Sequence, residues 1–354
     1  MAIFIQIMVL FSLIGLLDKI LGNKFNLAPS FDQGINAIGS MALSMMGFYC
    51  IATTFFSNNM TVINALSLQL HLEPSIIGAS FLAPDMGGYN IAKALSTNED
   101  LVIVAGLMVS SSIGCVISWQ LPIFLSSLQD ENLTDFIKGL IYGIIVLPMV
   151  MIPLCLYLNV NPLVLLPVFI LCAILLGCLI FLANQTIKVL DKFGQLIKII
   201  SYILFGLLII QLYFPFNYVP FELIQEAAMV VLKCGIIMSG SLVLSDLILS
   251  LFRSQIEAFS RALGLDPYSV IGLILSCATA VAIIPLFNKM DKRGRIMNGA
   301  FGVAGAYFAG AQLGFVSGAC DNKSVMMYLI FKILAGIVAI IVAYIFEPKD
   351  PRID

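Results

Sequence analysis

One carboxylate lies in an apolar stretch whose helix is expected to break around it. The stretch reads Ser80-Phe81-Leu82-Ala83-Pro84-Asp85-Met86-Gly87-Gly88-Tyr89-Asn90. Proline removes a backbone donor and glycine removes side-chain bulk, so both interrupt helices. At membrane depth, such a break is tolerated where it is buried or lines a wet cavity, and an ionisable group there indicates a functional site. Asp85 therefore suits a small organic cation, a sodium ion or a proton, whereas the structural alternative is an ion pair with Lys93.

The residues after Asp85 complete this candidate binding site. Gly87 and Gly88 allow a small ligand to approach the backbone. Tyr89 and Asn90 are the next polar side chains. An ammonium group about 4 Å from a carboxylate is stabilised by about 4 kcal/mol at an effective dielectric near 20, before the cost of desolvation. We therefore expect this segment to bind a small organic cation.

Three further polar residues in apolar runs are candidates for the same site. Asp246 is either a second ligand or proton site, or a helix-end residue close to Arg253. Gln312 is a lone amide in a glycine-rich run, with Tyr307 nearby. A buried amide needs hydrogen-bond partners, which would be a substrate hydroxyl or another helix.

The composition is that of a polytopic membrane protein. Of the 354 residues, 60% are hydrophobic and 11% are charged, whereas soluble domains carry about 25% charged residues. The formal net charge of -2 gives no indication of nucleic-acid binding. Met1–Leu17 lacks the basic start and small-residue cleavage site of a signal peptide, so we expect it to be a retained span in the lipid bilayer.

No pattern of an enzyme or a metal site is present in the sequence. The eight cysteines form no C-x-x-C pair, and His71 is the one histidine. Neither a nucleotide-binding loop nor a Ser/His/Asp arrangement occurs, so we expect no cofactor, no metal and no enzymatic activity.

Nine apolar runs approach the length of about 20 residues that a membrane span needs. They are Ala2–Leu17, Gly34–Phe56, Leu101–Leu125, Phe136–Leu158, Leu163–Ala183, Ile199–Phe214, Ala227–Leu251, Ile296–Gly318 and Val325–Phe346. Two further stretches, Pro74–Leu95 and Pro267–Phe287, are apolar but interrupted. They begin alike, with Leu72-Glu73-Pro74 and Leu265-Asp266-Pro267, which indicates a duplicated half.

The predicted fold is an all-α polytopic membrane protein with about nine spans and two re-entrant or broken helices in two inverted repeats. The first repeat covers residues 1–158 with its discontinuous segment at 74–95. The second covers 197–354 with its segment at 267–287, and 159–196 form a connecting helix and loop. Together they make one integral membrane domain.

Charged loops predict the orientation by the positive-inside rule. The cytoplasmic loops carry Lys188, Lys192 and Lys198; Arg253 and Arg261; and Lys289, Lys292, Arg293 and Arg295. The loop with Glu222 and Glu226 then lies outside. These assignments agree if the first broken segment enters from outside and the second from the cytoplasm. The acidic residues that would then also lie inside, against the trend, are Asp130, Glu131 and Asp135.

Several motifs resemble the ethanolamine-utilisation permease (EutH) family over nearly the whole chain. They are Asp85-Met86-Gly87-Gly88 with Ala92-Lys93, Lys289-Met290-Asp291-Lys292-Arg293-Gly294-Arg295 with Asn298-Gly299-Ala300-Phe301, Leu313-Gly314-Phe315, the early Gly34 to Gly47 pattern, and Lys332 with Gly336. The resemblance implies a multi-pass protein of the bacterial inner membrane that admits ethanolamine.

Two departures from the family pattern fall in or beside the second broken region. The family has an Asn pair before Ile-Pro, where this chain has Ala282-Ile283. The family has Asp-His before Leu-Gly-Phe, where this chain has Ala311-Gln312. Fewer fixed polar groups reject a wrong ligand less strongly, so we expect weaker selectivity than in the family.

The leading hypothesis is a transporter or facilitator of a small organic cation, most simply ethanolamine, by alternating access or facilitated diffusion. The alternatives are an ion-coupled transporter of another small solute and a non-transporting membrane sensor or assembly subunit. The sequence is compatible with a homo-oligomer.

The charge pattern generates a topology prediction. In a chain without its native cysteines, Lys292→Cys and Glu222→Cys should react from opposite sides of the membrane, because the first lies in a basic loop and the second in an acidic one. An impermeant maleimide added to intact cells should label position 222 and spare position 292 until the cells are permeabilised. Labelling of both positions from outside would contradict the topology.

Overall fold

The computed structural model describes residues 2–59, 69, 72–121, 124, 128 and 130–348. The described part is helical and contains no strand, which confirms the all-α class. Four of its helices are long and apolar enough to cross a membrane. They are Glu99–Gln120, Asn132–Tyr157, Phe221–Ile248 and Asn322–Phe346. The nine spans and the inverted repeat stay predictions.

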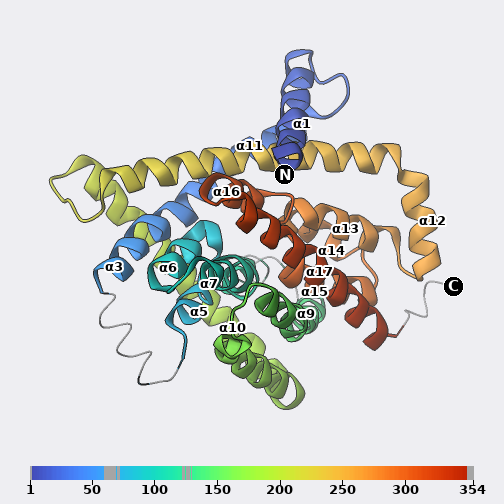
Figure 1. The fold of residues 1–354 in the computed structure, drawn as a ribbon. Coiled ribbons are helices and arrows are strands. Elements are labelled where there is room, and N and C mark those ends of the chain that lie inside the picture. The colour runs from blue at the N-terminus through green and yellow to red at the C-terminus, as the bar shows by residue number, and fades with distance from the viewer. Residues whose placement is uncertain are drawn as a thin grey trace. The chain divides into compact units, whose positions relative to one another are not determined.

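Figure 1 shows the fold, with most of the α-helices labelled in chain order. Up to the middle of the chain they are α1 (Ala2–Ile20), α2 (Ala28–Met41), η1 (Ala42–Met46), η2 (Phe48–Ala52), α3 (Thr53–Asn58), α5 (Pro74–Ala79), η3 (Pro84–Met86), α6 (Gly88–Leu95), α7 (Glu99–Val102), η4 (Ile103–Gly114), η5 (Val116–Gln120) and α9 (Asp130–Tyr157). The remainder are η6 (Pro162–Leu165), α10 (Leu166–Tyr213), α11 (Phe221–Leu251), α12 (Arg253–Leu263), α13 (Pro267–Ala278), η7 (Ala280–Ile283), α14 (Ile284–Phe287), α15 (Lys292–Ala304), α16 (Ala311–Ala319) and α17 (Asn322–Phe346).

The chain divides into two compact units, each built from separate stretches of sequence. Unit 1 consists of Met1–Ile38, Ser126–Val146 and Leu232–Asp354, and unit 2 consists of Gly39–Leu125 and Leu147–Val231. The broken segment with Asp85 belongs to unit 2, and the second broken segment belongs to unit 1. The division into repeats at 1–158 and 197–354 is a different partition and stays a prediction.

Both interrupted stretches fold as broken helices. The first consists of α5, the short 3-10 turn η3 and α6, and the second of α13, the 3-10 turn η7 and α14. Each begins with proline in the first helical turn, directly after the acidic residue Glu73 or Asp266. Proline is tolerated there because its missing N–H would have no partner within the helix. The acidic-residue–proline pairs in the sequence thus mark the two helix starts.

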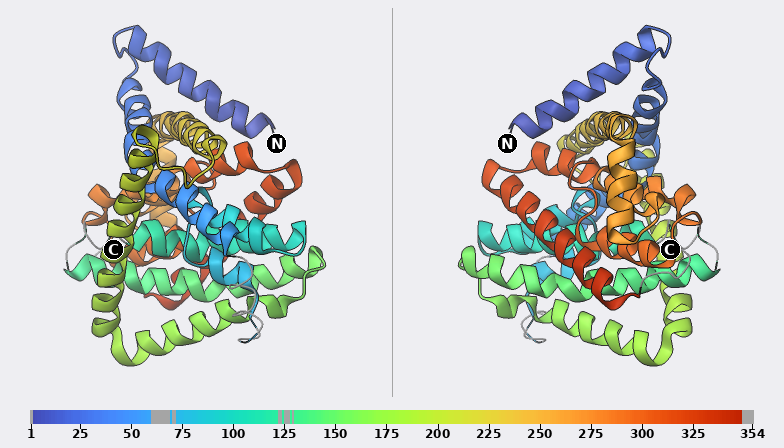
Figure 2. Two further views of the ribbon diagram at one scale, coloured as in Figure 1. Left: turned by 90° about the vertical axis from the view of Figure 1, so that its left-hand side faces the viewer. Right: turned by 90° about the vertical axis from the view of Figure 1, so that its right-hand side faces the viewer.

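The structure differs from the predicted spans in two places. The run 296–318 is not one helix, because α15 ends at Ala304 and α16 begins at Ala311. The runs 163–183 and 199–214 both lie largely within the single long helix α10. Figure 2 shows this helix, in green to olive, bending sharply between its two apolar segments.

One end of unit 1 gathers charged and aromatic side chains from α9, α15 and α17. The Nε atom of Arg295 lies 2.7 Å from Oδ2 of Asp135, and Lys138 lies 2.5 Å from Glu347. The Arg293 guanidinium stacks on the ring of Tyr344 at 3.5 Å. Asp135 therefore lies against the basic loop that the charge rule assigns to the cytoplasm, so its negative charge is compensated locally.

Two aspartates tie the start of the second broken helix to the start of α15. Asp266 Oδ1 accepts the N–H groups of Tyr268 (2.7 Å) and Ser269 (3.1 Å), and Asp291 Oδ1 accepts that of Gly294 (2.8 Å). Each aspartate also accepts the backbone N–H of the other on its Oδ2, at 2.5 and 2.8 Å. The Ser269 hydroxyl lies within 3.1 Å of both Oδ2 atoms. These contacts hold the start of the second broken helix against the start of α15.

The two carboxyl groups respond to pH in opposite directions. Burial, the hydrogen bond to Asp266 and its charge raise the pKa of Asp291 to about 6. Burial also disfavours the charge on Asp266, but hydrogen bonds from Asp291 and Ser269 lower its pKa. Because the folded protein holds the Asp291 proton more tightly than the unfolded chain, this stabilisation is complete below about pH 4 and is lost as the pH rises through about 6.

The substitution Asp291→Asn should remove this pH dependence. An asparagine keeps an acceptor oxygen for Gly294 and carries no titrating proton, although its NH2 group cannot accept the Asp266 N–H. We expect the thermal midpoint of the native protein to fall by a few degrees between pH 5 and 7.5, and that of the variant to stay level. The matched control is Asp321→Asn, which alters a helix cap bonded to Ser324 and should keep the native slope. A level native profile would contradict the assignment.

Candidate functional site

The tip of the first broken helix is a tight turn closed by backbone hydrogen bonds. The N–H groups of Met86 and Gly88 both donate to the carbonyl of Ala83, each at 3.0 Å. Gly87 has φ of +100°, a left-handed conformation that glycine adopts without strain. Pro84 begins the turn, and α6 starts at Gly88. The Pro-Asp-Met-Gly-Gly sequence thus reverses the chain with Asp85 inside the turn.

Asp85 is a buried carboxylate, 9% exposed, at this turn. Its carboxylate lies within hydrogen-bond reach of its own backbone N–H. Lys93 is exposed on α6, and within the described ranges neither Lys93 nor another cationic side chain forms an ion pair with Asp85. The structural alternative of an Asp85–Lys93 pair is therefore not realised. A buried carboxylate of this kind favours a cation or a proton as its partner.

The π-helical segments η4 and η5 of unit 2 contact the tip of the first broken helix through small residues at every fourth position. The Ser110 hydroxyl donates to the carbonyl of Leu82 (2.5 Å), and the Ala83 N–H donates to the Ser118 hydroxyl (3.0 Å). Between them lies Gly114, where an added Cβ would come within 2.2 Å of the Leu82 carbonyl oxygen. Residues 103–114 and 116–120 are π-helical, a conformation that is frequent at functional sites.

The residues that follow Asp85 are packed against the same unit. A Cβ on Gly88 would lie 2.2 Å from both the Leu82 carbonyl oxygen and the Ser110 hydroxyl. The ring of Tyr89 is buried and lies close to Gly106. The side chain of Asn90 approaches the hydroxyl of Tyr49 as a hydrogen-bond partner. Gly88 is therefore required for close approach of the backbone, whichever ligand binds.

Two residues beside this site have no local signal in the sequence. Tyr49 is 1% exposed, and its hydroxyl donates to the Glu226 carboxylate at 2.8 Å. Tyr49 stands in an apolar run, and its partner is 177 positions away. A buried tyrosine hydroxyl needs a partner, which is the general reason to inspect such a residue, but the sequence does not show which partner it has.

In unit 1, Tyr307 and Gln312 lie together at the interruption between α15 and α16. The Tyr328 hydroxyl is 3.1 Å from Gln312 Oε1 and 3.3 Å from the Tyr307 carbonyl oxygen. The Tyr307 N–H donates to the carbonyl of Ser276 near the end of α13 (3.0 Å). Tyr307 has φ of +67°, which is uncommon for a residue with a side chain and often marks a functional site.

The other candidates in unit 1 are engaged with neighbouring helices. Asp246 is half-buried in α11 and accepts a hydrogen bond from the Ser30 hydroxyl of α2. Gln312 has the interhelical partner Tyr328 that the structural alternative predicted. The structure thus brings Asp85, Gly87, Gly88, Tyr89 and Asn90 together in one unit. That they face Gln312, Tyr307 and Asp246 stays a prediction.

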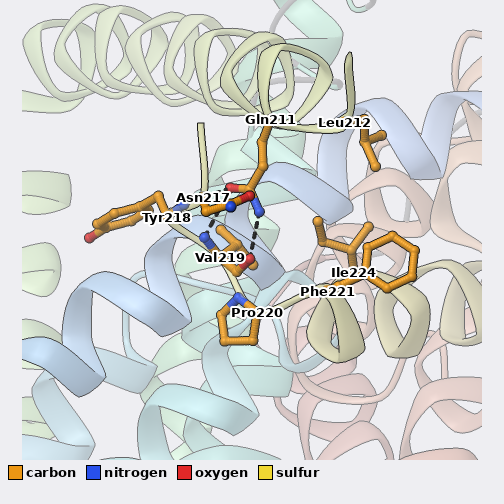
Figure 3. A pocket seen from close by; sticks show the side chains of 8 residues that line it. All are labelled: Gln211, Leu212, Asn217, Tyr218, Val219, Pro220, Phe221 and Ile224. Carbon is orange, nitrogen blue, oxygen red and sulfur yellow. Dashed lines mark hydrogen bonds between the residues drawn. The ribbon is translucent and has the colours of Figure 1, made fainter. Parts of the chain in front are cut away.

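A cavity of about 520 Å³ lies elsewhere in unit 2, at the loop between α10 and α11 (Figure 3). Gln211 closes this loop, because its side-chain oxygen accepts the N–H of Val219 (2.9 Å) and its amide nitrogen donates to the Val219 carbonyl (2.5 Å). The remaining lining residues are Leu212, Asn217, Tyr218, Pro220, Phe221 and Ile224. None of the candidate site residues lines this cavity. Its lining contains no Asp, Glu, Lys, Arg or His side chain that would select a charged ligand.

The long apolar helices and the buried carboxylate at a helix break define an integral membrane protein with a polar site in its interior. The family model described as "Ethanolamine utilisation protein, EutH" matches residues 1–346. The chain therefore belongs to the EutH family, as its motifs predicted.

Relatives cover almost the full length of this chain. The "Probable ethanolamine permease EutH" of Listeria monocytogenes is 28% identical over 345 residues, which are 96% of this chain and 92% of the relative. The protein of the same name from Salmonella typhimurium is 23% identical, with 98% and 96% covered. The "Uncharacterized protein YxeR" of Bacillus subtilis is 24% identical, with 97% and 94% covered. No solved structure matches the chain.

The substitution Gly88→Ala tests the geometry of the tip. The new methyl group would overlap the Leu82 carbonyl oxygen and the Ser110 hydroxyl, each 2.2 Å away, so we expect a loss of roughly 1–3 kcal/mol in stability. The matched control is Gly206→Ala in α10, where no atom lies within 4 Å of the added Cβ. This change should be neutral or stabilising by up to about 1 kcal/mol. Equal thermal midpoints for the two purified variants would contradict the tight tip.

Proposed function

We propose that this protein is a permease that carries ethanolamine, or a closely similar small organic cation, across the bacterial inner membrane. The observation that carries the proposal is the buried Asp85 carboxylate at a helix break, without a cationic side chain paired to it in the described part of the chain. Membership of the EutH family and relatives named as probable ethanolamine permeases support this substrate.

In the proposed site, Asp85 binds the ammonium group of the substrate. A desolvated carboxylate attracts a cation strongly because the local dielectric is low. Gly87 and Gly88 keep side chains away from the turn, so a two-carbon amine can approach the backbone. A solute with its own carboxylate would meet Asp85 with like charge and be rejected.

The substrate hydroxyl has proposed partners in the second broken region. Gln312 accepts a hydrogen bond from Tyr328 on its oxygen, which leaves its amide N–H groups as donors. Tyr307 lies beside it at the interruption of the helix. This part of the proposal requires the two broken regions to face one substrate, as an inverted repeat predicts. Transport then proceeds by alternating access or by facilitated diffusion.

Uptake into proteoliposomes tests the function. Labelled ethanolamine should enter above the rate of empty liposomes, and propanolamine should compete better than amino acids. The variant Asp85→Asn keeps the shape but deletes the charge, so uptake at low substrate concentration should fall about tenfold or more, which corresponds to roughly 1.4 kcal/mol. The matched control is Asp321→Asn, which removes the charge of a helix-cap residue bonded to Ser324 and should change uptake less than about threefold.

Two outcomes would contradict the proposal. Uptake of an anionic solute without uptake of ethanolamine would exclude the proposed substrate. Unchanged uptake by Asp85→Asn over a full concentration series, with normal insertion, would give Asp85 a structural role.

A further inference from the structure

A chain of three polar side chains connects the tip of the first broken helix to α11. Asn90 lies in the first turn of α6, directly after the tip. Its amide approaches the Tyr49 hydroxyl, which in turn donates to Glu226 in α11 at 2.8 Å. All three residues belong to unit 2. The acidic member is exposed, whereas the tyrosine that links it to Asn90 is buried.

The position of Tyr49 is fixed from two sides. It lies in the π-helical segment η2, and the neighbouring thiol of Cys50 contacts the carbonyl of Leu223 in the first turn of α11 at 3.8 Å. Two consecutive residues of η2 therefore bond to the start of α11. This double contact leaves the tyrosine ring little freedom to turn its hydroxyl away from Glu226.

The direction of the hydrogen bonds follows from the chemistry of the three groups. An ionised Glu226 can only accept, so the single hydroxyl proton of Tyr49 is donated to it. The Tyr49 oxygen then has lone pairs left and accepts from the neighbouring amide N–H of Asn90. When its nitrogen donates to Tyr49, the Asn90 amide has its carbonyl oxygen left as an acceptor.

We infer that Tyr49 and Glu226 are positioning residues that orient Asn90 for recognition of a primary ammonium group. The inference rests on the proposed function, and it adds a second acceptor to Asp85. A primary ammonium has three N–H donors and can satisfy both the Asp85 carboxylate and the Asn90 carbonyl. A quaternary ammonium such as choline has no N–H and gains nothing from Asn90. The chain of three side chains thus selects primary amines over fully methylated ones.

Transport kinetics of three variants test this inference in the full-length protein. Tyr49→Phe removes both hydrogen bonds and should raise KM for ethanolamine about threefold to tenfold, with a maximal rate within about twofold of the native value. Inhibition by choline should be unchanged. Glu226→Gln keeps a hydrogen-bond partner for Tyr49, but its amide allows the donor–acceptor direction of the hydrogen bonds to reverse. Its effect on KM should therefore be smaller than that of Tyr49→Phe and should not add to it. The matched control Glu222→Gln removes an exposed acid one turn earlier in α11 and should behave as the native protein.

Hydrogen exchange supplies a second readout that does not depend on transport. Amides of residues 84–95 should exchange faster in Tyr49→Phe than in Glu222→Gln, while residues 267–287 exchange equally in both. An unchanged KM together with unchanged exchange at 84–95 would overturn the inference, as would an equal rise of KM for ethanolamine and of the inhibition constant for choline. If the native protein does not take up ethanolamine, the proposed function fails, and equal exchange at 84–95 in the two variants would then overturn the positioning role as well.

Discussion

In unit 2 the Asp85 carboxylate is buried at a turn, and no cationic side chain in the described part of the chain forms an ion pair with it. Burying an ion costs several kcal/mol unless it is paired, so the turn must be held by other interactions. The structure supplies them through backbone and hydroxyl groups: Ala83 closes the turn, and Ser110 and Ser118 bond its rim. These fixed hydrogen bonds hold the backbone of the tip, and in the proposed function the Asp85 carboxylate binds the ammonium group of the substrate.

Local sequence signals predicted the parts of the fold in which backbone chemistry is decisive. Pro84 and Gly87 mark the turn because proline narrows and glycine widens the range of accessible backbone conformations, whatever residues surround them. The interruption after Ala304 could not be predicted in the same way. It places Tyr307, which is not a glycine, at a positive φ and bonds its N–H to Ser276, a contact between distant segments.

The candidate site shows the same limit. Asp85 could be found because a charge in an apolar run is costly wherever it lies. Tyr49 and Glu226 could not, since a tyrosine in an apolar run and an acid near the start of a helix are both ordinary, and their pairing exists only in the folded chain. Gln312 was recognised as an amide that needs a partner, and the structure identifies that partner as Tyr328.

The two broken helices are anchored differently, which bears on where recognition resides. The start of the second is held by the hydrogen bonds between Asp266 and Asp291. Its first helix, α13, also accepts a hydrogen bond from the Tyr307 N–H. Around Ala282 and Ala311 this chain has few polar side chains, and Gln312 is one of them. In the proposed function, the acceptors that distinguish one amine from another therefore lie mainly on the first broken helix. Under that proposal, an amine with few partners in the second region is recognised mainly through its ammonium group, so Asp85 and Asn90 determine which amines are admitted.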